Sequence, residues 1–141
     1  MTGSTSNPRN TAILYACVAA GGILGSVARW VASLLIPVVS GFPYATLFVN
    51  ITGSFIIGFY STLSGPDGRL FATTRQRQFV MTGFCGGYTT FSAFSLETIR
   101  LLRDGMNHTA LSYIAVSVVT WLVAVWLGHM LASRLNRLKG S

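Results

Sequence analysis

The stretch GFCGGYTTFSAFS, residues 83–95, lies inside an apolar segment and carries no charge. It holds three glycines, two threonines, two serines and a tyrosine within thirteen residues, whereas lipid-facing helices consist mainly of larger apolar side chains. The adjacent Gly86 and Gly87 weaken a helix. Backbone groups freed by a break are tolerated at membrane depth only where they are buried in protein or line a cavity. The stretch therefore predicts a membrane helix that is broken near Gly86 and Gly87.

The composition supports a membrane location for the whole chain. Of its 141 residues, 51% are hydrophobic and 9% are charged, and the mean hydropathy is +0.57. Soluble domains carry about 25% charged residues, so this chain has too few charges to cover a soluble surface. The net charge of +7 comes from basic residues at the edges of apolar runs, which is typical of membrane spans and not of nucleic-acid binding. Cys17 and Cys85 form no CxxC or Cys/His pair, so neither a disulfide framework nor a zinc site is indicated.

Four apolar segments are long enough to cross a bilayer, which needs about 20 residues of helix. The sequence predicts an all-α membrane protein with one membrane domain at residues 11–133, between a polar tail at 1–10 and a basic tail at 134–141. The predicted spans lie near residues 11–36, 42–64, 78–103 and 107–133. The first is interpreted as a retained span and not as a cleaved signal peptide.

The basic residues also indicate an orientation. An even number of spans places both termini on the side of the loop between the second and third spans. That side holds seven basic residues: Arg9, Arg69, Arg75, Arg77, Arg134, Arg137 and Lys139. The other side holds three, which are Arg29, Arg100 and Arg103. The positive-inside rule therefore favours cytoplasmic termini.

Two spans carry polar side chains along one helical face. In the second span, Thr46, Asn50 and Ser54 recur every four residues and share a face. Because a lone amide in hydrocarbon costs several kcal/mol, Asn50 must face protein or water. It either forms an interhelical hydrogen bond or lines a hydrated pathway.

The fourth span has a comparable row, Tyr113, Ser117 and Trp121, with Thr120 adjacent. Interfacial anchoring of Tyr113 and a backbone hydrogen bond from Ser117 are equally good explanations of this row. Rows of small residues in the first and fourth spans, Cys17–Gly21–Gly25 and Ala124–Gly128–Ala132, are attributed to close helix packing.

Beyond the glycine pair, Phe91 and Phe94 share one helical face, and Ser92 and Ser95 form a row beside it. Aromatic edges are electropositive, so edges aligned with hydroxyl and amide donors favour a small anion over a cation. Plain packing is the alternative for the two phenylalanines. The acidic residues Asp67, Glu97 and Asp104 all lie near span ends, so the sequence offers no deep carboxylate for proton coupling.

Three segments together resemble the Fluc-type fluoride channels, also called the CrcB family. They are GGILGSVARW at 21–30, FPYATLFVNITGSFIIG at 42–58 and TGFCGGYTTFSAFSLE at 82–97, and the resemblance extends over nearly the whole chain. It implies a fluoride-selective channel, not an enzyme, that exports fluoride passively across the plasma (inner) membrane and gives resistance to fluoride toxicity. It also implies an antiparallel, dual-topology homodimer of four-helix subunits with two pores.

The resemblance implies specific residue roles. The fluoride pathway would be lined by Asn50, Phe91 and Phe94, with further donors from Thr46, Ser92, Ser95, Tyr113 and Ser117. Arg29 would lie at a vestibule that attracts anions. A structural sodium ion at the dimer interface would be held by the backbone carbonyls of Gly86 and Thr89 from both subunits.

The sequence departs from the family pattern at two positions. Ala93 lies where many relatives carry a hydroxyl, and Trp121 replaces a small hydroxyl residue, for which Thr120 is a possible substitute. The strong bias in basic residues also leaves a heterodimer with a fixed-orientation partner as an alternative to the homodimer. Two other classes of protein are alternatives. A small multidrug transporter needs a glutamate in the first span, and there is none here; a non-transporting assembly subunit would use the small and polar rows only for packing.

Overall fold

The computed structural model describes residues 7–66 and 68–137, and every regular element in these ranges is a helix. Most of the predicted N-terminal tail, Asp67 and the end of the predicted C-terminal tail, including Lys139, lie outside the described residues. The elements are α1 (Pro8–Leu35), α2 (Tyr44–Leu63), α3 (Thr74–Arg77), η1 (Gln78–Cys85), α4 (Gly86–Tyr88), α5 (Phe91–Arg103) and α6 (Asn107–Arg137). The predicted all-α class is confirmed.

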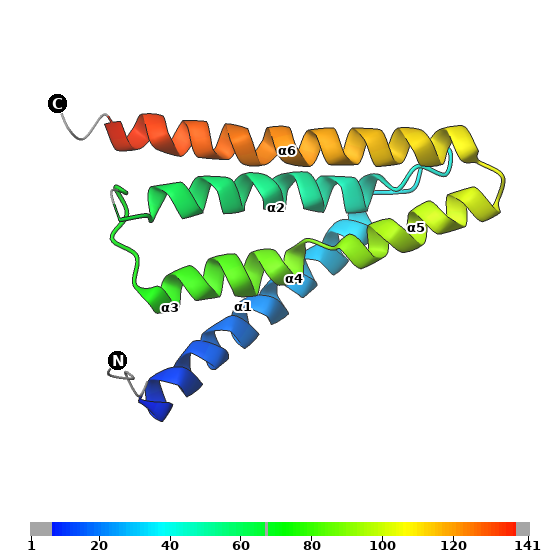
Figure 1. Cartoon of the computed structure of the whole chain (residues 1–141). Coiled ribbons are helices and arrows are strands. Elements are labelled where there is room, and N and C mark those ends of the chain that lie inside the picture. Colours follow the sequence, from blue (N-terminus) through cyan, green and yellow to red (C-terminus); the bar gives the residue numbers. More distant parts are fainter. Residues whose placement is uncertain (1–6, 67, 138–141) are drawn as a thin grey trace, which may run out of the picture.

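The helices run back and forth between two ends of the molecule (Figure 1). Within the described residues, α1, α2 and α6 are each long and apolar enough to cross a membrane. The remaining crossing is made in two parts, α3–η1–α4 and then α5. The start of α1, the loop between α2 and α3 and the end of α6 therefore lie at one end, as an even number of crossings requires.

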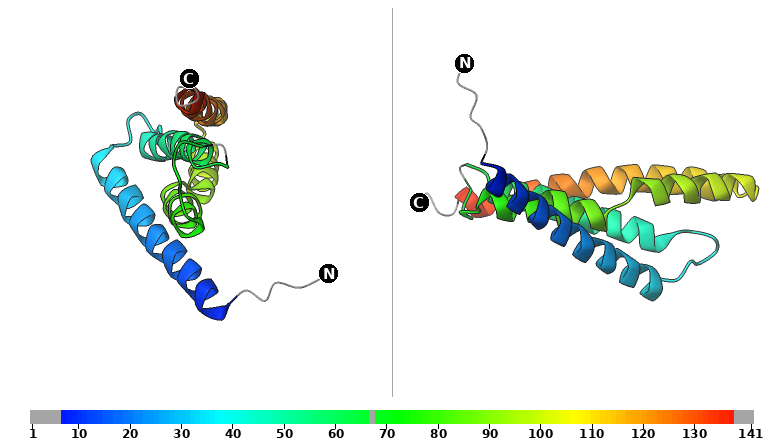
Figure 2. Two further views of the ribbon diagram at one scale, coloured as in Figure 1. Left: turned by 90° about the vertical axis from the view of Figure 1, so that its left-hand side faces the viewer. Right: turned by 90° about the horizontal axis from the view of Figure 1, so that it is seen from below.

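The crossings are arranged with α2 and the broken helix between α6 and α1 (Figure 2). α2 packs mainly along α6, and α1 packs mainly across η1 and α4. Glycines allow these close contacts: a Cβ on Gly25 of α1 would overlap the carbonyl oxygen of Phe84 in η1. A Cβ on Gly128 of α6 would likewise overlap the carbonyl oxygen of Phe55 in α2. The prediction that the small-residue rows serve helix packing is confirmed at these positions.

The predicted break in the third crossing is confirmed, but it lies just beyond the glycine pair, at Thr89 and Thr90. Gly86 and Gly87 are helical, and the chain becomes extended at Thr89 (φ −82°, ψ 159°) and Thr90 (φ −153°, ψ 119°). Gly87 is required for packing, because a Cβ there would overlap the carbonyl oxygen of Gly22 in α1. The two β-branched threonines take the extended conformation that such residues favour.

Thr90 then starts the second half of the crossing. Its side-chain Oγ1 accepts a hydrogen bond from the backbone N–H of Ala93 at 3.2 Å, which makes Thr90 the N-cap of α5.

The segment before the break also differs from an ordinary helix, since Gln78–Cys85 is a π-helix. Such segments are rare and frequently lie at functional sites. The sequence analysis did not predict this π-helix.

Candidate functional site at the helix break

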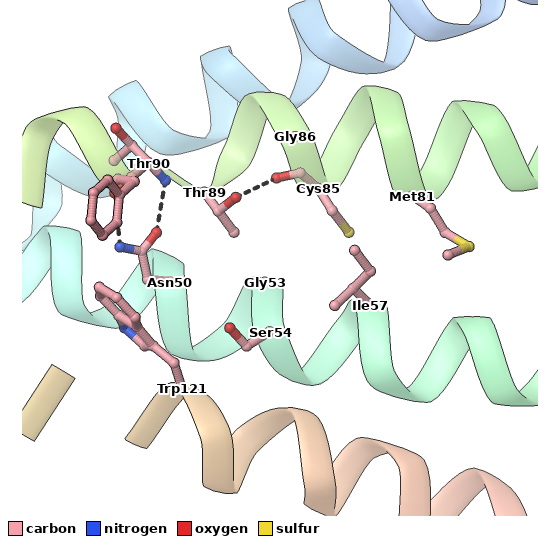
Figure 3. A pocket seen from close by; sticks show the side chains of 11 residues that line it. Asn50, Gly53, Ser54, Ile57, Met81, Cys85, Gly86, Thr89, Thr90 and Trp121 are labelled. Carbon is pink, nitrogen blue, oxygen red and sulfur yellow. Dashed lines mark hydrogen bonds between the residues drawn. The ribbon is translucent and has the colours of Figure 1, made fainter. Parts of the chain in front are cut away.

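Asn50 of α2 is hydrogen-bonded to the break through both halves of its amide (Figure 3). Its Nδ2 donates to the carbonyl oxygen of Thr90 at 3.0 Å, and the backbone N–H of Thr90 donates to Asn50 Oδ1 at 2.7 Å. In a continuous helix that N–H would donate to the carbonyl of Gly86. Asn50, which is 5% exposed, thus replaces the helical hydrogen bond that the break removes. The interhelical hydrogen bond predicted as one role of Asn50 is confirmed.

Asn50 also borders a cavity of about 280 Å³ next to the break. An amide nitrogen carries two N–H groups and Thr90 accepts only one, so one donor remains. The cavity is lined by Asn50, Gly53, Ser54, Ile57, Met81, Cys85, Gly86, Thr89, Thr90, Phe91 and Trp121 (Figure 3). None of these described lining residues is charged, so the cavity is neutral, with a few polar groups in a mainly apolar lining.

The carboxylate of Glu97 points inward between helices. The sequence predicted only that this residue lies near a span end. Thr46 Oγ1 donates to Glu97 Oε1 at 2.7 Å, and the Tyr113 hydroxyl donates to Glu97 Oε2 at 2.7 Å. Thr46 and Tyr113 are both buried. Their hydroxyls are therefore engaged with Glu97 in this structure. The spacing of three residues between Phe94 and Glu97 puts both on one face of α5, but it does not identify Thr46 or Tyr113 as partners.

The two phenylalanines of the predicted pathway have different surroundings. Phe94 is 7% exposed, and its ring centroid lies 5.1 Å from that of Tyr113 and 5.0 Å from that of Trp121. Phe91, with its centroid 5.6 Å from Phe94, is 71% exposed in the single chain and lines the cavity. Phe94 therefore belongs to the packed interface of α5 and α6, and Phe91 faces outward beside the break.

The hydroxyl row on α5 is turned largely toward its own helix. Ser95 Oγ donates to the carbonyl oxygen of Phe91 at 2.9 Å. Ser92 Oγ lies 3.3 Å from Thr90 Oγ1, and either hydroxyl can be the donor. Neither serine is among the residues that line the cavity.

The polar row on α6 contains donors without partners. Ser117 Oγ and Trp121 Nε1 are both buried, and neither has a hydrogen-bond partner within the described part of the chain. Thr120, considered as a substitute for Trp121, instead donates to the carbonyl oxygen of Val116 at 2.6 Å. Thr120 does not line the cavity, and its substitution for the expected hydroxyl stays a prediction.

The predicted vestibule residue and the predicted sodium ligands differ in whether they line the cavity. Arg29 lies partly buried on α1 and does not line the cavity, whereas Gly86 and Thr89 both line it. The residues that the structure describes contain no group of three or more His, Cys, Asp or Glu side chains able to hold a metal. At the break, backbone carbonyls are the groups that fit a hard cation.

These features define a small multi-pass membrane protein with an uncharged, mainly apolar cavity at an interrupted helix. Sequence comparisons place the chain within that class. The profile of the family described as “CrcB-like protein, Camphor Resistance (CrcB)” matches residues 16–129. The chain belongs to this family.

Relatives of known name are similar over almost the whole chain. A protein of Bradyrhizobium diazoefficiens named “Fluoride-specific ion channel FluC 1” is 61% identical, over 98% of this chain and 97% of its own length. A protein of the same name from Rhodopseudomonas palustris is 62% identical, over 94% and 96%. “Fluoride-specific ion channel FluC” of Opitutus terrae is 54% identical, over 91% and 98%. The family is thus one of ion channels and not of enzymes.

Replacing Asn50 with Ala tests its structural role. The variant leaves the N–H and C=O of Thr90 unpaired in a buried position, so we expect the free energy of unfolding to fall by about 1–3 kcal/mol. Reversible unfolding in detergent, followed by circular dichroism, measures this change. Asn10→Ala is the matched control, because its amide is exposed and we expect a change within about 0.5 kcal/mol. Equal losses in both variants would contradict the assigned role.

Proposed function

We propose that this chain forms a fluoride-selective channel in the inner membrane, through which fluoride leaves the cell passively and fluoride toxicity is reduced. The similarity of nearly the whole chain to proteins named as fluoride-specific channels carries this proposal. The neutral, donor-bearing cavity at the helix break supports it independently.

The chemistry of fluoride matches this cavity. Fluoride is small and strongly hydrated, so its removal from water is costly unless hydrogen-bond donors replace the hydration shell. Conduction also requires that the ion leave again, which favours neutral donors over a fixed positive charge. The remaining N–H of Asn50 and the O–H of Ser117 are neutral donors of this kind. The electropositive ring edges of Phe91 and Phe94 would add to them.

The hydroxyls of the other proposed pathway residues already have hydrogen-bond partners in the single chain. Thr46 and Tyr113 would have to release Glu97 before they could donate to fluoride. Ser92 and Ser95 would contribute only after giving up their present hydrogen bonds on α5. Arg29 would act at a distance, by raising the local concentration of anions at a vestibule.

The working unit that we propose is an antiparallel, dual-topology homodimer with two pores. Gly86 is exposed on the single chain, and its carbonyl has lost the Thr90 N–H as a helical partner. An unpaired carbonyl facing lipid would cost several kcal/mol, so a cover of protein or an ion is needed. A second copy would supply that cover and would also enclose the exposed Phe91.

A structural sodium ion fits the same place. Hard cations are held by oxygen ligands, including backbone carbonyls. The carbonyls of Gly86 and Thr89 flank the break, and a Cβ on Gly86 would meet nothing within 4 Å, so the space beside it is open. The second copy would double the number of carbonyl ligands. The ion would compensate the backbone groups that the break leaves unpaired and would take no part in conduction.

Purified protein in liposomes tests the channel activity. We expect rapid loss of internal fluoride through the wild-type protein and almost no loss of chloride. Phe91→Ile removes a ring edge from the pathway and should lower the fluoride rate by several-fold, up to about tenfold. Phe48→Ile, on the exposed side of α2, is the matched control and should not change it. Equal chloride efflux would contradict the selectivity, and failure to conduct any halide would favour a non-transporting assembly subunit.

Native mass spectrometry tests the assembly. We expect the protein released from detergent to have the mass of two chains plus one sodium ion, because both copies contribute carbonyls to one site. Single-cysteine labelling of loop residues in whole cells should then modify each site from both sides of the membrane. A monomer, a metal-free dimer or labelling from one side only would each contradict the corresponding part of the proposal.

A further inference from the structure

Within the described residues, two buried donors on α6 have no hydrogen-bond partner, and they lie on the same face. Ser117 Oγ and Trp121 Nε1 are four residues apart, so their side chains are neighbours on the helix surface. Buried indole N–H groups usually find a hydrogen-bond partner, and leaving one unpaired is costly. Two unpaired donors on one face therefore indicate a missing hydrogen-bond acceptor more strongly than either donor alone.

Trp121 extends from α6 into the cavity that Asn50 and Phe91 border (Figure 3). Its ring meets that of Phe94 at an angle of 74°, with the centroids 5.0 Å apart, which fixes the indole beside the break. The neighbouring hydroxyl of Thr120 is engaged with the backbone of its own helix. Trp121 is thus the side chain through which α6 reaches the cavity.

The chemistry of the unengaged groups favours an anion. The indole N–H is a donor only and cannot bind a cation through a lone pair. The acceptor oxygen of Asn50 is already occupied by the Thr90 N–H, which leaves an N–H as its free group. Asn50 and Trp121 both line the cavity, and none of its described lining residues is charged. Ser117 does not line it, but lies one helical turn from Trp121 on the same face of α6.

We propose that the indole N–H of Trp121 donates a hydrogen bond directly to fluoride in transit, together with Asn50 and Ser117. The proposal rests on the proposed channel function and assigns to position 121 a donor role that a small hydroxyl residue would otherwise fill. The competing interpretation is that the N–H points at the face of the Phe94 ring, in which case Trp121 contributes packing only.

The variant Trp121→Phe separates these interpretations, because it keeps an aromatic ring against Phe94 and removes the N–H. In liposomes we expect its fluoride efflux to fall about tenfold, as the loss of one hydrogen bond to an anion predicts. Trp126→Phe, on the exposed side of the same helix, is the matched control and should conduct like wild type. Unchanged efflux in Trp121→Phe overturns the proposal.

A binding measurement distinguishes a donor from a merely structural ring. In protein labelled with 15N-tryptophan, the Trp121 indole N–H resonance, identified by its absence in Trp121→Phe, should shift on addition of fluoride. It should not shift on addition of chloride at the same ionic strength, and the Trp30 and Trp126 resonances should stay in place. Reduced efflux without this shift means that the ring acts by packing, which also overturns the proposal. A wild-type protein that conducts no fluoride would instead overturn the proposed function, and the indole shift is measured independently of conduction.

Discussion

The pair of hydrogen bonds between Asn50 and Thr90 is the interaction on which the rest of the structure depends. At membrane depth no water is available for a free N–H or C=O, so a helix can stop there only if other groups replace its hydrogen bonds. The side-chain amide is suited to this, since it carries a donor and an acceptor side by side, as a peptide group does. With Thr90 held in this way, the chain is able to turn and α5 can start from a capped residue.

The same pair organises the groups around the cavity. By accepting the Thr90 N–H, Asn50 takes the place of the Gly86 carbonyl as its acceptor, and one N–H of Asn50 is left over after its bond to Thr90. In the function that we propose, acceptors and donors would thereby be separated, and sodium and fluoride would have distinct places without any charged side chain in the described cavity lining. The carboxylate of Glu97 is held by Thr46 and Tyr113. The donors available for an anion are therefore fewer than the polar rows of the sequence suggest.

Much of this was predictable from the sequence, because a bilayer imposes length and polarity on each segment. The helical class and the inward position of Asn50 follow from apolar run lengths and from the cost of a lone amide. The position of the break did not follow: Gly87 is helical because α1 lies against it, and only the tertiary contact with Gly22 reveals this. The contacts of Glu97 join residues 51 and 16 positions apart, beyond the range of any helical period. That the Trp121 N–H has no partner in the described part of the chain also depends on how the neighbouring helices pack.

Hydrogen–deuterium exchange at the backbone amide of Thr90 tests the central claim most directly, since that amide belongs to no intact helix. If Asn50 Oδ1 accepts its hydrogen bond, Thr90 should exchange as slowly in the wild-type protein as the buried amides of α2, and much faster after Asn50→Ala. Rapid exchange of Thr90 in the wild type, or slow exchange that survives the loss of the Asn50 amide, would contradict the account.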